Sequence, residues 1–342
     1  MTITQSSQAP LVVIGGATGN QGGSVLRYLK DSDKEYRIRA LTRDSTKPKA
    51  KALANLGAEV ISIDLKPENQ DKIEKAYAGA DVVFVSVTEP NAPIYPLTDI
   101  HGQAVTNFWE HVDKQREINE GKAMIDAGVA AGVKLFIFSS LPSPENKSKG
   151  AISNVHHFEG KARIEEYGRT KSSPTFQFVA VQAGFYDSNI IGQQLVRKEG
   201  DGTWVYRTPI SADTLVPSID IDEYGLWVRA IIEHKEVRED GRAVPADAED
   251  ISLRDMITAI TKATGTPIKI VDNMPYDEFV KTFPEGTPPH VIEDLGVDMW
   301  KFHAKDGYFL GVDTKWPLKY LAHKPSTFAE WLKKADLSEY TK

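Results

Sequence analysis

The sequence reads Leu11-Val-Val-Ile-Gly-Gly-Ala-Thr-Gly-Asn-Gln-Gly-Gly-Ser-Val-Leu-Arg-Tyr-Leu29 close to its start, and this stretch decides the fold. Its first four residues are apolar and mostly β-branched, a pattern typical of a parallel strand buried on both faces. Five glycines follow within nine residues, and residues 24–29 indicate a helix. A strand, a glycine turn and a helix in this order predict a loop that binds the phosphates of a dinucleotide.

The glycines have separate expected roles. Gly16 permits a tight turn, and Gly19 lets the backbone approach a pyrophosphate. Either Gly22 or Gly23 lets the helix lie close to the strand. Free N–H groups at the positive end of the helix dipole then face the phosphates. The predicted cofactor-binding residues of this loop are Gly16, Thr18, Gly19, Asn20, Gln21 and Gly22. The alternative, a glycine-rich loop without a ligand, is the weaker hypothesis because a strand and a helix flank the glycines.

The end of the second expected strand indicates which dinucleotide is bound. Residues 36–42 alternate as a strand should and lead into Arg43, with Asp44 one residue later. Sites that prefer NAD place an acidic residue near this point to hold the ribose hydroxyls. An arginine there can instead hold a 2′-phosphate with a charge-assisted fork. Arg43 therefore predicts NADP(H), and the alternative is a solvated surface arginine.

Apolar and amphipathic runs alternate along the first half of the chain. Strands are expected at residues 59–63, 81–87, 134–138 and 175–181, with helices at 49–56, 67–78, 104–131 and around 157–167. This rhythm predicts a parallel sheet with right-handed crossovers. Ligands bind at the carboxyl ends of such strands. The further candidates at those ends are Asp64, Leu65, Val87, Thr88 and Ser139. Residues 89–103 form a long proline-rich loop, which is either a lid or an insertion.

The pattern changes from residue 183 onward. Strands are expected at 203–207 and 268–271, and helices at 222–233 and 327–334. A further helix follows the capping pattern of residues 252–255. We predict an α/β fold, a doubly wound Rossmann sheet with a smaller, interleaved C-terminal α+β lobe. Residues 1–182 form the expected Rossmann domain and residues 183–342 the lobe, with residues 215–232 returning to the first domain.

Composition and charge narrow the functional classes. The chain has 342 residues, 41% hydrophobic and 26% charged, as in ordinary soluble globular proteins. Its net charge of −7 offers no basic surface for nucleic acid or an anionic membrane. The absence of cysteine excludes disulfides and thiolate chemistry, and the histidines show no metal-binding spacing. The N-terminus is polar and no run could span a bilayer, so we expect a cytoplasmic protein that could also enter the nucleus.

The glycine loop resembles that of a known family. Its spacing is G-x-x-G-x-x-G over Gly16, Gly19 and Gly22, which is similar to the atypical and extended short-chain dehydrogenase/reductases. The full run Gly-Gly-Ala-Thr-Gly-Asn-Gln-Gly-Gly resembles the NmrA-like family. This resemblance implies that the protein binds NADP(H).

The expected catalytic segment departs from the short-chain reductases. Those enzymes use a serine, a tyrosine, and a lysine four residues after the tyrosine, on one face of a helix. This chain reads His157-Phe-Glu-Gly-Lys161, so His157 stands where the tyrosine is expected. The resemblance to the NmrA-like helix implies that Lys161 contacts the nicotinamide end of the cofactor. His157 is a second catalytic candidate because imidazole exchanges protons near neutral pH, and Ser139 or Ser140 could stand in for the serine.

The segment after the sixth strand also resembles the family. Gly184, Tyr186 and Asn189 match residues that border the nicotinamide pocket in NmrA-like proteins. They complete the set of cofactor-binding residues that the resemblance implies.

Two functions stay open at this stage. The resemblance and the missing tyrosine favour an NADP(H)-binding, redox-sensing regulatory protein with little conventional dehydrogenase activity. Such a protein would report to a protein partner, for example a transcription factor. The alternative is an NADPH-dependent reductase of quinones or conjugated carbonyl compounds, since related reductases use a lysine without the usual tyrosine. Neither function requires direct contact with nucleic acid or a membrane.

Overall fold

The computed structural model describes residues 3–86, 114–192, 195–283, 287, 289–309 and 311–341. Val87, Thr88 and the proline-rich loop of residues 89–103 lie outside this range. The expected helix of residues 104–131 is described from residue 114 onward, as α5 (Lys114–Ala130).

A seven-stranded parallel sheet forms the centre of the first lobe. Its order is β11-β6-β5-β4-β1-β2-β3. The strands are β1 (Leu11–Ile14), β2 (Arg37–Thr42), β3 (Glu59–Ser62), β4 (Val82–Ser86), β5 (Leu135–Ser140), β6 (Gln177–Ala183) and β11 (Val244–Ala246). All six neighbouring pairs are parallel. The strand order reverses between β1 and β4, the point at which ligands bind in such sheets.

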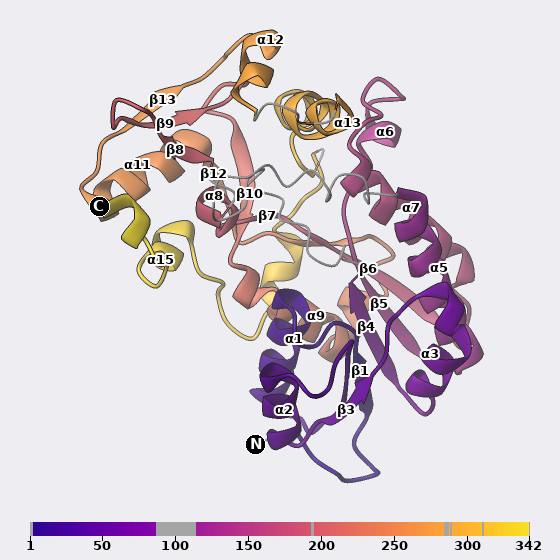
Figure 1. Cartoon of the computed structure of the whole chain (residues 1–342). Helices are drawn as coiled ribbons and strands as arrows, with labels where there is room; N and C mark the ends of the chain where they lie inside the picture. Colours follow the sequence, from indigo (N-terminus) through magenta and orange to yellow (C-terminus); the bar gives the residue numbers. More distant parts are fainter. Residues whose placement is uncertain are drawn as a thin grey trace.

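Helices cover both faces of this sheet (Figure 1). One face carries α1 (Asn20–Lys30), α2 (Pro48–Asn55) and α9 (Gly225–Glu233). The other carries α3 (Gln70–Tyr77), α5 and α7 (His156–Lys171). In β1, Val12 and Ile14 join the core under α1 and α9, while Leu11 and Val13 join the core under α3 and α5. Because both faces are buried, every residue of β1 is apolar.

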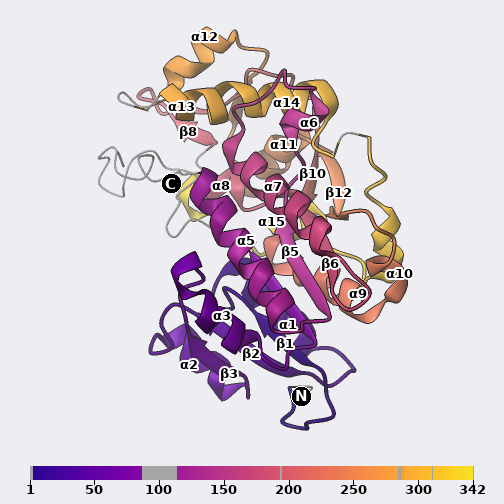
Figure 2. The same cartoon turned by 90° about the vertical axis from the view of Figure 1, so that its right-hand side faces the viewer.

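The second lobe lies above the sheet in Figure 1 and contains two small sheets. The first joins β7 (Phe185–Tyr186), β10 (Leu215–Ile219) and β12 (Glu249–Ser252). The second joins β8 (Val196–Lys198), β9 (Trp204–Arg207) and β13 (Ile268–Val271). The main helices are α11 (Leu253–Thr264), α14 (Met299–Asp306) and α15 (Phe328–Leu332). Figure 2 shows α14 close to α6 (Pro144–Lys147), near the start of α7.

The chain crosses back from the second lobe to the first. Helix α9 packs directly on α1, where a Cβ atom at Gly225 would lie 2.5 Å from the carbonyl oxygen of Ser24. The Ser24 hydroxyl donates to the carbonyl of Asp222 at 2.7 Å and accepts from the Gly225 N–H at 2.8 Å. Strand β11 then joins the edge of the main sheet. The domain boundary between residues 182 and 183 stays a prediction.

The fold class is confirmed. Sequence analysis missed one strand of the main sheet, β11, and four short strands of the second lobe, β7, β8, β10 and β12. Strand β11 has three residues and contains Pro245, which weakens any strand pattern. A proline is tolerated there because β11 is an edge strand. No helix within the described residues is both long and apolar enough to cross a lipid bilayer.

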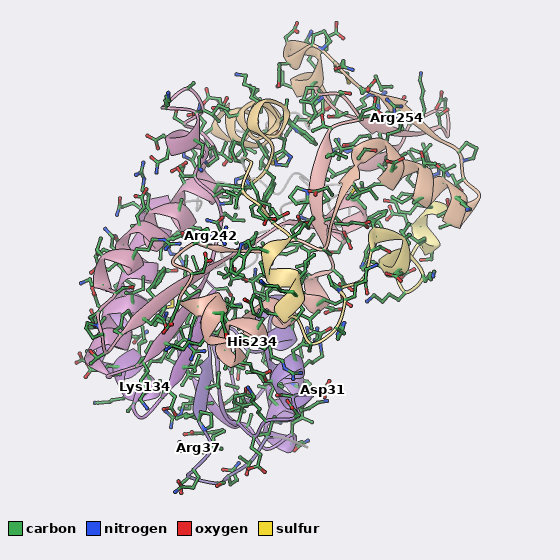
Figure 3. All side chains as sticks on the ribbon, turned by 180° about the vertical axis from the view of Figure 1, so that it is seen from behind. Asp31, Arg37, Lys134, His234, Arg242 and Arg254 are labelled. Carbon is green, nitrogen blue, oxygen red and sulfur yellow. The ribbon has the colours of Figure 1, made fainter. Side chains whose placement is uncertain are left out.

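An ion pair between Asp81 and Lys134 lies at the end of the sheet opposite the glycine turn. Asp81 accepts from the Leu11 N–H at 2.9 Å and pairs with Lys134 at 2.8 Å. Figure 3 shows Lys134 and Arg37 at this lower end of the molecule, seen from behind. The glycine turn lies at the opposite, carboxyl-terminal edge of the sheet, where α/β sheets of this kind bind their ligands.

Candidate functional site

The glycine turn lies at the carboxyl-terminal edge of the sheet, beside the reversal of strand order. The Gly15 N–H donates to the carbonyl of Phe84 at 2.8 Å, and the Gly19 N–H donates to the carbonyl of Gly16 at 2.8 Å. Gly16 has a φ of 63°, a conformation that favours glycine. Helix α1 begins at Asn20, and no side chain of the described residues caps it. The first-turn N–H groups therefore have no intrahelical acceptor and can bind an anion.

The geometry distinguishes the roles of Gly22 and Gly23. A Cβ atom at Gly22 would overlap the carbonyl oxygen of Gly16 and lie 2.8 Å from its carbonyl carbon. A Cβ atom at Gly23 would lie 3.6 Å from the nearest atom, the carbonyl oxygen of Ala17. Gly22 is therefore the glycine that allows α1 to approach the turn.

The end of β2 lies beside the glycine turn. The hydroxyls of Thr18 and Thr42 are 3.3 Å apart, and the next residue, Arg43, is exposed. Asp44 accepts from the hydroxyl of Thr46 at 2.6 Å and from its N–H at 2.8 Å. These hydrogen bonds lower the pKa of Asp44. Asp44, the acid that could hold ribose hydroxyls, is thus hydrogen-bonded within its own turn. Arg43 is then the charged side chain at the end of β2 that is available to a cofactor.

The two candidates after β3 have different surroundings. Leu65 lies next to the glycine turn, because a Cβ atom at Gly15 would be 3.2 Å from its Cδ1 atom. Asp64 is partly exposed and pairs with Lys66 at 2.7 Å. Leu65 therefore borders the turn directly, whereas the side chain of Asp64 already has a partner.

The fold brings Gln21 and Tyr186 together across 165 residues. The Gln21 amide donates to the Tyr186 hydroxyl at 2.5 Å. Burial raises the pKa of Tyr186 to about 12, so its phenol stays protonated at neutral pH. Asn189 follows at the start of the short helix α8 (Asn189–Gly192) and is partly buried. The strand β7 thus reaches the first turn of α1.

Gly184 has a packing role in this structure. Its N–H donates to the carbonyl of Ala246 at 2.9 Å. A Cβ atom at this position would lie 2.7 Å from the carbonyl oxygen of Pro217. The backbone at Gly184 lies close to both β10 and β11, and this packing accounts for the glycine. Its contact with a cofactor stays a prediction.

Lys161 forms an ion pair that sequence analysis did not anticipate. Its Nζ atom lies 2.5 Å from Oε1 of Glu117 on α5 and 3.4 Å from the carbonyl oxygen of His157. The side chains of Lys161 and Glu117 are 19% and 8% exposed. The sequence signal was an acidic residue on the buried face of an amphipathic helix, next to the buried Ile118.

His157 points toward the second lobe. Its Nδ1 atom lies 2.9 Å from Oδ1 of Asp294, and the other oxygen of Asp294 accepts from the His156 N–H at 3.1 Å. Asp294 belongs to the π-helical segment Ile292–Asp298. A role for His157 in catalysis stays a prediction, and Asp294 is a neighbour that sequence analysis missed.

An aromatic cluster lies beyond His157. Phe158 contacts Phe302 and Tyr308, with ring centroids 5.8 and 5.4 Å apart. His303 lies 5.3 Å from the ring of Tyr308, and burial lowers the pKa of His303 to about 4. His303 is therefore neutral at physiological pH. These contacts join the start of α7 to the C-terminal segment.

The two serines at the end of β5 face different neighbours. Both are buried, at 3% and 1% exposure for Ser139 and Ser140. The Ser140 hydroxyl donates to the carbonyl of Lys161 at 3.3 Å, whereas Ser139 lies beside Tyr224. Of the two candidate serines, Ser140 is therefore the one that contacts α7.

A buried acid directly follows Tyr186. Asp187 accepts a hydrogen bond from the Ser218 hydroxyl and is fully inaccessible to solvent. Burial raises the pKa of Asp187 to about 7, and the charges of Asp220, Glu249 and Glu223 act in the same direction. Within the described residues, no group of His, Asp and Glu has the arrangement of a metal site.

The fold and the glycine turn define a Rossmann-type α/β protein. Within that class, the chain belongs to the NmrA-like family, whose family model matches residues 8–332. The chain is 31% identical over 271 residues to an NmrA-like family domain-containing protein of Dictyostelium discoideum, covering 78% of this chain and 82% of that protein. It is 29% identical over 299 residues to the NmrA-like family domain-containing oxidoreductase cpsB of Aspergillus campestris, covering 83% and 81%.

Solved structures show the same fold at low sequence identity. NmrA, described as a negative transcriptional regulator, in complex with NADP has a TM-score of 0.73 and 19% identity, covering 98% of this chain and 97% of NmrA. An NADPH-dependent quinone oxidoreductase of Escherichia coli in complex with NADPH has a TM-score of 0.69 and 19% identity, covering 95% and 99%.

Proposed function

We propose that this protein binds NADP(H) at the glycine turn and acts as an oxidoreductase on quinones or other conjugated carbonyl compounds. The observation that carries the proposal is the uncapped start of α1 beside Gly16, with Arg43 at the end of the neighbouring strand. The printed names of several similar proteins, which call them oxidoreductases, support this class of activity.

The described residues fit the proposed cofactor. The first-turn N–H groups of Asn20, Gln21 and Gly22 would hold the pyrophosphate, because no side chain of the described residues caps this end of α1. Arg43 would hold the 2′-phosphate, since Asp44 is engaged with Thr46. Tyr186 and Lys161 would lie toward the nicotinamide end. When bound, NADPH would supply a hydride, that is, a proton together with two electrons.

The residues of the chain favour acceptors that stabilise negative charge themselves. The ammonium of Lys161 can stabilise charge on an acceptor oxygen electrostatically. Reduction of a simple ketone also needs a proton donor, and general acid catalysis of this kind is worth a factor of about 10² to 10⁴. His157 replaces the usual phenol and faces Asp294. A quinone or an enone delocalises the charge and depends less on that donor.

The test combines binding with turnover. Binding of NADPH is measured by fluorescence titration, and oxidation of NADPH is followed with quinones, enones, simple ketones and aldehydes. We expect turnover of conjugated acceptors that falls in Lys161→Met, with little reduction of simple ketones. Rapid reduction of a simple ketone would identify a conventional reductase, and lack of NADPH binding would refute the proposal.

A redox-sensing regulatory protein is the second candidate. The lack of a phenol at position 157 favours it, and NmrA itself is described as a negative transcriptional regulator. Such a protein would pass its ligand state to a protein partner, for example a transcription factor. Tight NADPH binding without turnover of any acceptor would support it, together with hydrogen-exchange patterns that differ between NADP⁺ and NADPH.

A further inference from the structure

The interface between α5 and α7 contains a largely buried ion pair among close apolar contacts. Glu117 of α5 pairs with Lys161 of α7 at 2.5 Å. One turn along α5, the interface is apolar and tight, because a Cβ atom at Gly121 would lie 2.5 Å from Cδ1 of Ile164. Buried ion pairs are often no more stabilising than apolar residues of similar volume. Stability alone therefore does not account for a charged pair at this position.

The absence of a side chain at Gly160 makes room for the carboxylate of Glu117. A Cβ atom at Gly160 would overlap Oε2 of Glu117 and lie 3.1 Å from its Cδ atom. Gly160 lies inside α7, where glycine is less favourable than alanine. The missing side chain is what allows the carboxylate to lie across α7, next to the residue that carries the ammonium.

The donors of Lys161 can be counted. An ammonium has three N–H donors. One points to Glu117, and the carbonyl oxygen of His157 lies 3.4 Å from Nζ, in the range of a weak second bond. The third N–H has no partner among the described residues. The described residues thus hold the ammonium from two sides, and among them one donor is left for a ligand.

We propose that Glu117 is the positioning residue of Lys161. Gly160, which has no side chain, leaves the space on α7 that the Glu117 carboxylate needs to reach the Lys161 ammonium. The carboxylate fixes where the ammonium lies, so that its remaining donor meets the nicotinamide half of the dinucleotide. This inference rests on the proposed function, because it assigns Lys161 to the nicotinamide end of NADP(H). Glu117 itself needs no contact with the cofactor.

The first experiment compares two ligands in Glu117→Gln. NADPH carries the nicotinamide half, whereas 2′,5′-ADP carries the adenine half alone. We expect NADPH to bind about tenfold more weakly, the size of one lost charge-assisted hydrogen bond, while the Kd of 2′,5′-ADP is unchanged. The matched control is Glu120→Gln on the same helix, whose carboxylate pairs with Arg116 at 2.9 Å. The control should change neither Kd.

The second experiment moves the carboxylate without removing a charge. Gly160→Ala places a methyl group where Oε2 lies, and we expect it to reproduce the selective loss of NADPH affinity. Gly121→Ala is the control, because its methyl group would meet Ile164 at the same helix interface and no atom of the ion pair. That control should lower thermal stability while the ratio of the two Kd values stays as in the wild type.

A double mutant tests the coupling directly. If Glu117 acts through Lys161, then Glu117→Gln should add no further loss of NADPH affinity in Lys161→Met. Additive losses would overturn the proposal, as would equal weakening of NADPH and 2′,5′-ADP in Glu117→Gln, which indicates a merely structural role. Unchanged NADPH binding in that variant would also overturn it. A wild-type protein that binds neither ligand would refute the proposed function itself, and this role with it.

Discussion

The close approach of α1 to the glycine turn makes Gly22 the most informative position for a substitution. A Cβ atom there would lie 2.8 Å from the carbonyl carbon of Gly16 and 3.0 Å from Cα of Ala17. Carbon atoms in contact prefer separations of about 3.5–4.0 Å. Gly22→Ala therefore requires a shift of about 0.5–1 Å, and both neighbours are backbone, so no side chain can rotate away.

The magnitude follows from two opposing effects. Overpacking of this kind costs about 1–3 kcal/mol. Alanine is a better helix former than glycine, which returns about 0.5–1 kcal/mol. We expect Gly22→Ala to lose up to about 2.5 kcal/mol of stability. It should also lose at least about tenfold in NADPH affinity, because the displaced N–H groups no longer converge on the phosphates.

The matched control is Gly23→Ala. Its Cβ atom would lie at an ordinary 3.6 Å from the nearest neighbour, the carbonyl oxygen of Ala17. This control should keep wild-type affinity and gain slightly in stability. Urea unfolding and fluorescence titration of NADPH measure both quantities. If Gly22→Ala binds NADPH as tightly as Gly23→Ala does, the turn is not the phosphate site.

Three further predictions concern specificity, protonation and the second lobe. Arg43→Ala should remove the preference for NADP⁺ over NAD⁺, which we expect to be worth about 1.5–3 kcal/mol, or about 10- to 100-fold in Kd. Calorimetric titration of both cofactors checks this, and equal Kd values in the wild type would already contradict it. The pKa of Asp187 is raised to about 7 in the folded protein, so the stability from this group is full below about pH 4 and is lost as pH rises to about 7. Asp187→Asn should therefore become more stable than wild type by an amount that grows over that window, up to about 4 kcal/mol, in urea unfolding at several pH values; a difference that shrinks with rising pH would contradict it. His157→Tyr should add no reduction of simple ketones in an NADPH-oxidation assay, because position 157 faces Asp294; a clear gain would show that this position reaches the acceptor.

Much of the fold could be predicted from local sequence patterns. An apolar run of four residues predicted β1 because a parallel strand covered on both faces has no polar side. The alternation of strands and helices predicted the parallel sheet. Crossovers between parallel strands are almost always right-handed, which leaves few possible sheet topologies. The tight turn at Gly16 was predictable as well. Its positive φ is a local backbone conformation that glycine adopts far more readily than other residues.

The site itself depended on contacts between distant segments, which no local pattern encodes. Sequence analysis left the choice between Gly22 and Gly23 open, and the distance from α1 to Gly16 decided it. Tyr186 meets Gln21, and Glu117 meets Lys161, because separate helices and strands pack at particular distances and rotations. His157 occupies the expected position in the motif, yet its partner, Asp294, comes from the C-terminal segment. Periodicity determines which face of an element is buried, whereas the packing of one element on another determines which side chains meet there.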